Sequence, residues 1–118
     1  MGLTTVDLTI KNPLQSDKHA SENFLIDSGA SYTVVPQALV KKLNLKPSFD
    51  REFTLTDGKK VRRSIGSAII RYGNEEISTP VVLGKKGDSA LLGVITLESF
   101  GLALDPFQRK LYKAKMML

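Results

Sequence analysis

The chain alternates apolar and polar residues over many short stretches, a pattern that predicts strands. Near the N-terminus, Val6, Leu8 and Ile10 alternate with polar residues, as in a strand with one buried face. Similar short runs, bounded by glycine, proline and asparagine, predict further strands. These lie at residues 23–27, 33–35, 53–55, 61–65, 67–72, 76–83, 90–92, 102–104 and 110–113. The polar segment from Asn12 to Ser21 is predicted to be a loop.

Two segments have the spacing of helices instead. Leu39, Val40 and Leu43 recur at three- and four-residue intervals, which places them on one face of a short helix. Pro36 suits the first turn of that helix, and Asn44 is a plausible end. Residues 94–100 predict a second helix of one to two turns, since a glycine follows directly.

Turn-forming residues separate the predicted strands. The pair Asp57-Gly58 predicts a tight turn that joins two strands into a hairpin, and Gly73-Asn74 ends another strand. Pro80 favours a sheet edge or a bulge, because proline donates no hydrogen bond to a neighbouring strand. Many short strands with two small helices predict an all-β fold closed on itself. We expect one domain over residues 1–118.

Composition narrows the possible functions. The chain has no cysteine and a single histidine, so disulfides, thiolate catalysis and cysteine-based or histidine-rich metal sites are excluded. No apolar run approaches the roughly 20 residues of a membrane-spanning helix, and the start lacks the pattern of a signal peptide. We therefore expect a cytoplasmic protein without a membrane partner.

The net charge of +5 raises the question of nucleic-acid binding. The excess of lysine and arginine lies in the second half of the chain. However, the three Tyr and five Phe are not interleaved with these basic residues in a stripe. We expect no nucleic-acid partner, and a steep salt dependence of any binding would identify one.

Residues 24–31 hold the most informative chemistry, because Asp27 directly follows three apolar residues. An apolar run favours burial, whereas a lone buried carboxylate is costly and needs compensation. Ser28 can form hydrogen bonds, and Gly29 allows close approach of the backbone. Two interpretations remain open at this point: a functional carboxylate, or an Asp in an ordinary turn at the end of a strand.

A second segment favours the functional interpretation. Leu91, Leu92 and Gly93 place two large apolar residues before a glycine and a predicted helix. The two segments together resemble the motifs of the retroviral-type, or retropepsin-like, aspartic proteases, and most closely the single-domain versions encoded in cellular genomes. The likeness covers about residues 4–113.

The resemblance implies a closed β-barrel of the acid-protease type with one or two short helices, active as a symmetric homodimer. It implies that Asp27 from each subunit is catalytic and that Ser28, Gly29 and Ala30 support the site. The Leu91, Leu92 and Gly93 segment would lie behind the site as a structural motif. The partners would be a second copy of the chain and an extended peptide or protein substrate, with no cofactor and no metal.

The hairpin around Thr56, Asp57 and Gly58 is the candidate flap over the substrate, although an ordinary surface hairpin has the same pattern. Basic residues follow at 59–63, where strand alternation places Lys60 and Arg62 on one face. This run is either a solvated surface or the basis of a preference for acidic substrates.

Two features depart from the family pattern. Val94 and Ile95 follow Gly93, where family members often have a charged or polar residue that contributes to the dimer interface. The tip of the hairpin also lacks the glycine-rich, apolar character of the viral enzymes. The main alternative function is therefore a non-catalytic module that binds an extended peptide on the same fold.

Overall fold

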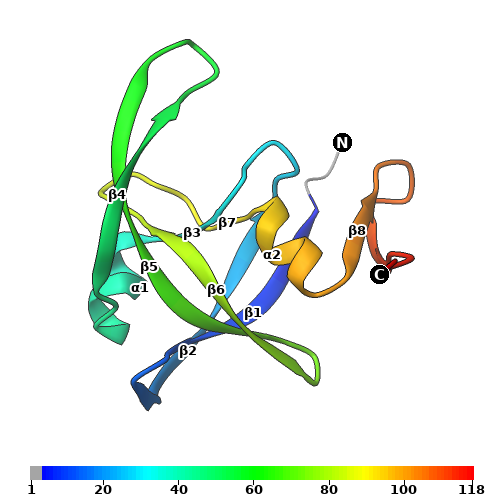
Figure 1. The fold of residues 1–118 in the computed structure, drawn as a ribbon, viewed down its shortest axis with the longest axis horizontal. Helices are drawn as coiled ribbons and strands as arrows, with labels where there is room; N and C mark the ends of the chain where they lie inside the picture. The colour runs from blue at the N-terminus through cyan, green and yellow to red at the C-terminus, as the bar shows by residue number, and fades with distance from the viewer. Residues whose placement is uncertain (1–3) are drawn as a thin grey trace.

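The computed structural model describes residues 4–118, most of which lie in β-strands (Figure 1). Seven strands share one sheet: β1 (Thr5–Asn12), β2 (Gln15–Ile26), β3 (Thr33–Val35), β4 (Pro47–Thr54), β5 (Lys60–Tyr72), β6 (Glu75–Leu83) and β7 (Leu91–Leu92). A separate hairpin contains β8 (Leu102–Asp105) and β9 (Lys110–Lys113). Two short helices are present in this part of the chain, α1 (Gln37–Leu43) and α2 (Val94–Ser99). The predicted all-β class with two short helices is confirmed.

The large sheet closes into a ring. Its strand order is β1-β2-β7-β3-β6-β5-β4, and β1 also pairs with β5 through residues 9–11 and 69–71. This additional pairing joins the two sides of the sheet and leaves β4 outside the ring, attached to β5 alone. The closed architecture expected from the sequence is therefore present.

The core fills the interior of this ring with apolar side chains from most strands and from both helices. Each large side chain that is fully buried stabilises the fold by roughly 1.5–3 kcal/mol through removal of apolar area from water. The helix α1 contributes Leu39 and Leu43, and α2 contributes Leu97. The strands supply Leu8, Ile10, Phe24, Ile26, Val35, Ala68, Ile70, Val81, Leu83 and Leu92.

The predicted loop from Asn12 to Ser21 is wrong, because this segment belongs to a long antiparallel hairpin of β1 and β2. Only Pro13 and Leu14 lie between the two strands. The side chain of Asn12 organises this turn, since its Oδ1 accepts hydrogen bonds from the N–H groups of Leu14 and Gln15. Most residues of 13–21 are exposed, so the strand carries no apolar alternation that could reveal it.

Residues 61–65 and 67–72 form one continuous strand, β5, rather than two. Gly66, which suggested a break, is instead a point of close packing: a Cβ there would lie 2.5 Å from the carbonyl oxygen of Lys46. Pro80 lies in the part of β6 that pairs with β5 alone, directly before the pairing of β6 with β3 begins at Val81. The predicted edge position of this proline is confirmed.

The helix boundaries also follow the sequence signals. Asn44 ends α1 in the left-handed conformation with φ of 57°, and Gly101 follows α2 with φ of +68°. Beyond α2, the hairpin of β8 and β9 packs Leu102, Leu104 and Leu111 against the core. This hairpin lies at one side of the ring, next to the C-terminus (Figure 1).

Candidate active site

Asp27 lies directly after β2, at the start of a loop that leads into β3. Its side chain is half-buried, and Oδ1 accepts a hydrogen bond of 2.9 Å from the N–H of Gly29. Its own N–H donates to the carbonyl of Leu92, and its carbonyl accepts from Ala30. The bond from Gly29 forms an Asx turn, which was one of the two interpretations of Asp27 that the sequence allowed. It orients the carboxylate without burying it.

The strand β7 supports this loop from behind by inserting between β2 and β3. Leu91 and Leu92 pair in parallel with Leu25 and Ile26, and Leu91 also faces Val34 of β3. The predicted supporting segment therefore lies against the two strands that carry the Asp27 loop.

Gly93 passes against the far end of the same loop at a distance that excludes any side chain. A Cβ at this position would lie 2.4 Å from the carbonyl carbon of Tyr32 and 2.5 Å from its oxygen. Just after it, the N–H of Val94 donates to Ala30 and that of Ile95 donates to Ser31, at 2.8 and 3.0 Å. The start of α2 thus holds the loop through its backbone.

A buried pair of threonines completes the support. The hydroxyls of Thr33 and Thr96 lie 2.6 Å apart, and the N–H of Gly93 donates to Oγ1 of Thr33 at 3.1 Å. Both side chains are fully buried. Sequence reasoning missed both residues, because a threonine in an apolar run carries no signal of its partner.

The other predicted site residues are placed as follows. Ser28 and Gly29 are exposed on the Asp27 loop, and Ala30 is half-buried. Thr56, Asp57 and Gly58 are exposed at the tip of the β4–β5 hairpin, where Gly58 has φ of +86°. This hairpin and the Asp27 loop project from the same side of the ring (Figure 1).

The β4 arm of the hairpin contacts the loop through residues that the sequence did not single out. The rings of Tyr32 and Phe53 meet edge to face with centroids 6.0 Å apart. Nε of Arg51 donates to the hydroxyl of Tyr32 at 3.1 Å. The outer half of the β4 arm of the candidate flap is therefore attached to the end of the Asp27 loop.

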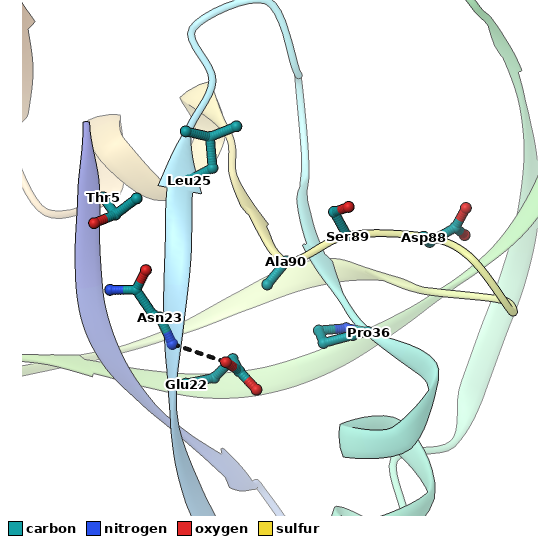
Figure 2. A pocket seen from close by; sticks show the side chains of 8 residues that line it. All are labelled: Thr5, Glu22, Asn23, Leu25, Pro36, Asp88, Ser89 and Ala90. Atoms are coloured by element: carbon teal, nitrogen blue, oxygen red, sulfur yellow. Dashed lines mark hydrogen bonds between the residues drawn. The ribbon is translucent and has the colours of Figure 1, made fainter. Parts of the chain in front are cut away.

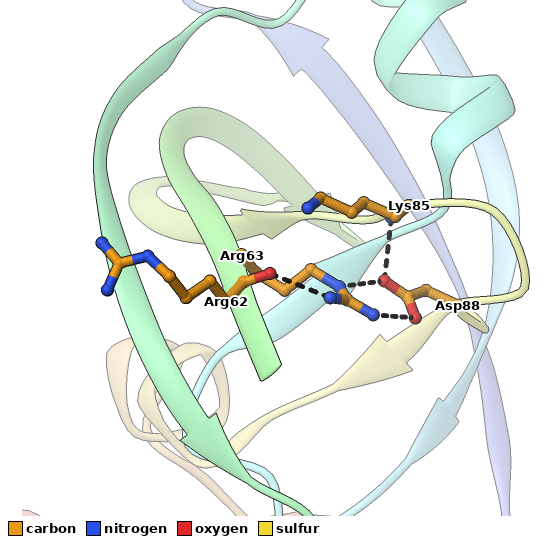
Figure 3. A network of polar contacts seen from close by, with 4 residues as sticks. All are labelled: Arg62, Arg63, Lys85 and Asp88. Carbon is orange, nitrogen blue, oxygen red and sulfur yellow. Dashed lines mark hydrogen bonds and ion pairs between the residues drawn. The ribbon is translucent and has the colours of Figure 1, made fainter. Parts of the chain in front are cut away.

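An ion pair makes a second attachment, from β5 to the segment before β7 (Figure 3). Arg63 binds the carboxylate of Asp88 through two nitrogens, at 2.6 and 3.0 Å, and the N–H of Lys85 donates to the same carboxylate. The hydrogen bond from Arg63 is the main cause that lowers the pKa of Asp88, and the same bond raises the pKa of Arg63.

A pocket of about 470 Å³ opens beside the strand that carries the carboxylate (Figure 2). Leu25 lies two residues before Asp27, and its side chain faces this pocket together with Ala90. The remaining lining residues are Thr5, Glu22, Asn23, Pro36, Asp88 and Ser89. Leu25, Pro36 and Ala90 make up its apolar part.

Residues 4–118 contain no group of histidine and acidic side chains arranged to hold a metal ion. Neither helix in this part of the chain is long and apolar enough to cross a membrane.

A ring-like β fold in which a strand and a short helix hold an Asp-Ser-Gly loop defines the retroviral type of aspartic protease. A family model confirms this class: residues 15–99 match the family described as "gag-polyprotein putative aspartyl protease", and the chain belongs to that family.

Solved structures agree on the fold. The EIAV protease, in complex with the inhibitor HBY-793, matches with a TM-score of 0.67 and 18% identity over 99% of this chain and 94% of that chain. The simian foamy virus (mac) protease matches with a TM-score of 0.53 and 16% identity over 80% of this chain and 94% of that chain. No curated protein matches the chain.

The close approach at Gly93 predicts a large effect of the smallest substitution. Gly93→Ala should destabilise the protein by about 3 kcal/mol or more, because the clash is with backbone and only a shift of the loop relieves it. The matched control is Gly73→Ala, where a Cβ meets nothing within 4 Å but φ is +60°. This control should cost only about 1–2 kcal/mol. Chemical denaturation measures both, and equal losses would contradict the clash.

The ion pair of Asp88 predicts a dependence of stability on pH. Because the folded-state pKa is lowered, the carboxylate stabilises the fold above its unfolded pKa of about 4, and this contribution is lost as pH falls through the folded value. Asp88→Asn should therefore lower the free energy of unfolding at pH 7, and this effect should shrink as the pH falls below about 4. Asp17→Asn, at an exposed position of β2, is the control. A difference for Asp88→Asn that stays constant with pH would contradict this assignment.

Proposed function

We propose that this protein is an aspartic endopeptidase that acts as a symmetric homodimer, with Asp27 of each subunit in a shared active site. One observation carries the proposal: a half-buried carboxylate, oriented by Gly29, lies in a loop that β7 and α2 hold in place. The sequence contains a single Asp-Ser-Gly motif, so each chain supplies one of the two carboxylates that this chemistry needs.

The two carboxylates share one proton and divide the work of acid and base. The ionised carboxylate takes a proton from a bound water, whose oxygen attacks the carbonyl carbon of the scissile peptide bond. The protonated carboxylate donates its proton to the carbonyl oxygen. The tetrahedral intermediate then collapses and the C–N bond breaks. The leaving amine nitrogen takes the proton that the first carboxylate removed from water, and a hydroxyl of the intermediate returns its proton to the other carboxylate.

The neighbours of Asp27 support this reaction in the proposed dimer. The hydroxyl of Ser28, on the exposed part of the loop, bonds across to the partner loop. The carbonyl of Gly29 accepts a hydrogen bond from the substrate backbone. Ala30 holds the loop to α2, because its carbonyl accepts the bond from Val94.

The β4–β5 hairpin acts as the flap that covers the peptide. Its tip at Thr56, Asp57 and Gly58 is exposed, while its two arms are attached to Tyr32 and Asp88. Closure of such a flap excludes water from the cleaved bond and holds the peptide extended. A side chain of that peptide enters the pocket beside Leu25.

Exposed apolar residues of the C-terminal region support dimer formation. Phe107 and Tyr112, in the β8–β9 hairpin, are 95% and 52% exposed, and Met116 and Met117 follow. A monomer gains nothing from exposing these side chains, whereas a second copy can bury them. At the start of α2, Val94 and Ile95 are half-buried, so the interface there is apolar rather than ionic.

The second candidate function is a module that binds an extended peptide without cleaving it, since the flap and pocket suit both roles. A peptidase needs Asp27 for cleavage, whereas a binding module does not.

Asp27→Asn removes the proton acceptor and keeps the size of the side chain. We expect cleavage of a diverse peptide library to fall by about 10²–10⁴-fold or more, as for loss of an acid–base group. The fold and the dimer should be retained, as measured by circular dichroism and sedimentation. Asp17→Asn serves as the control with the same loss of charge. Equal cleavage by wild type and Asp27→Asn would refute the proposal, and unchanged peptide binding without cleavage by either would favour the binding module.

A site that needs two chains predicts that specific activity depends on protein concentration. Activity per chain should fall on dilution below the dissociation constant of the dimer, which sedimentation measures independently. Excess Asp27→Asn protein should inhibit the wild type by forming mixed dimers with one Asp27. An active monomer, with constant specific activity on dilution, is the result that rules out the shared site.

A further inference from the structure

The β4–β5 hairpin separates its charged residues onto two faces. Residues directly opposite each other in an antiparallel pair point to the same face of the sheet. Alternate residues along each strand also share a face. On one face, Asp50 and Glu52 lie near Arg62 and Lys60 at 3.9 and 3.7 Å. The charges of this face therefore cancel. Lys59, at the turn, lies 3.9 Å from Asp57. Three of the basic residues at 59–63 are thus close to a carboxylate and do not form a free positive surface.

The other face carries two arginines and no acid of its own. Arg51 and Arg63 lie directly opposite each other in the register. Asp88, which arrives from the segment before β7, neutralises Arg63 with two hydrogen bonds. Within residues 4–118, Arg51 forms no ion pair with a carboxylate. It is therefore the uncompensated positive charge of this face.

The guanidinium of Arg51 is held in a defined position. Its Nε donates to the hydroxyl of Tyr32 at 3.1 Å, and its central carbon lies 4.8 Å from the ring centroid of Phe49. One of its five donors is thus used, and up to four remain for a ligand. A guanidinium that is already positioned loses little freedom when it binds a carboxylate through two parallel bonds.

The position of Arg51 relates it to the candidate active site. Tyr32 closes the loop that Asp27 begins, and Phe53 of the same hairpin face packs on the Tyr32 ring. This face of the hairpin is therefore turned toward the Asp27 loop. A peptide held extended between flap and loop would pass this face a few residues away from the bond that is cleaved.

We propose that Arg51 is a specificity-determining residue that binds an acidic side chain of the substrate. The preferred substrates carry Asp or Glu at one fixed position away from the scissile bond. This proposal rests on the proposed peptidase function. It assigns the preference for acidic substrates to Arg51 of β4, rather than to the basic run at 59–63.

The test uses pairs of labelled peptides that differ only by Glu or Gln at one position, with that position moved along the peptide. Wild type should cleave the Glu peptide about tenfold faster, as kcat/KM, at one position, since a hydrogen-bonded ion pair is stronger than its neutral counterpart. Arg51→Gln should reduce this ratio to about one, and Arg51→Lys should retain part of it. Arg51→Glu should instead favour Lys at the same position.

Arg62→Gln is the matched control, because it removes the same charge from the opposite face of the hairpin. It should leave the Glu-to-Gln ratio unchanged. A ratio near one for wild type at every position would overturn the proposal. So would a loss of the ratio in Arg62→Gln, or an equal loss of cleavage for both peptides in Arg51→Gln with the ratio intact.

Binding separates this proposal from the catalytic one. Fluorescence anisotropy with the Asp27→Asn protein measures affinity for the same peptide pairs without cleavage. Tighter binding of the Glu peptide, lost when Arg51→Gln is added, supports the role of Arg51 even if wild type cleaves no peptide. Equal affinities in this assay would contradict it, whether or not wild type is an active peptidase.

Discussion

The contact between Gly93 and the backbone of Tyr32 is the constraint on which the candidate site depends. Because no side chain separates the two segments, α2 comes close enough for its first N–H groups to bond with Ala30 and Ser31. Those bonds fix the loop, and the loop fixes the carboxylate of Asp27 at the end of β2. The apolar core behind β7 therefore determines the geometry of a polar group at the surface.

The β4–β5 hairpin combines two attached arms with an exposed tip. Two contacts of different kinds join the hairpin to the body: an aromatic pair with Tyr32 and an ion pair with Asp88. Both lie on the arms, and the tip residues around Gly58 are exposed, with hydrogen bonds that close only their own turn. Only the residues from Thr54 to Lys60 lie beyond these contacts, so a movement of the tip alone would leave the Asp27 loop undisturbed.

Local signals made much of this molecule predictable. The Asp27 loop, Gly93, the α1 helix and the Asp57-Gly58 turn each depend on a few adjacent residues with special backbone or chemical properties. The long β1–β2 hairpin could not be predicted, because its outer part is exposed on both faces and leaves no alternation. The partnerships of Thr33 with Thr96 and of Arg51 with Tyr32 join residues distant in sequence, so they follow only from the three-dimensional fold.

The insertion of β7 between β2 and β3 has a consequence for the order in which the protein is made. The backbone groups that hold the Asp27 loop belong to residues 92–95, so the ribosome must add these residues before that loop can be fixed. Pairing between segments so distant in sequence closes late, because the entropy of a large loop must first be overcome. A nascent chain that ends before residue 92 therefore carries its Asp-Ser-Gly motif without these bonds. The loop around Asp27 can be organised only when residues 92–95 have left the ribosome.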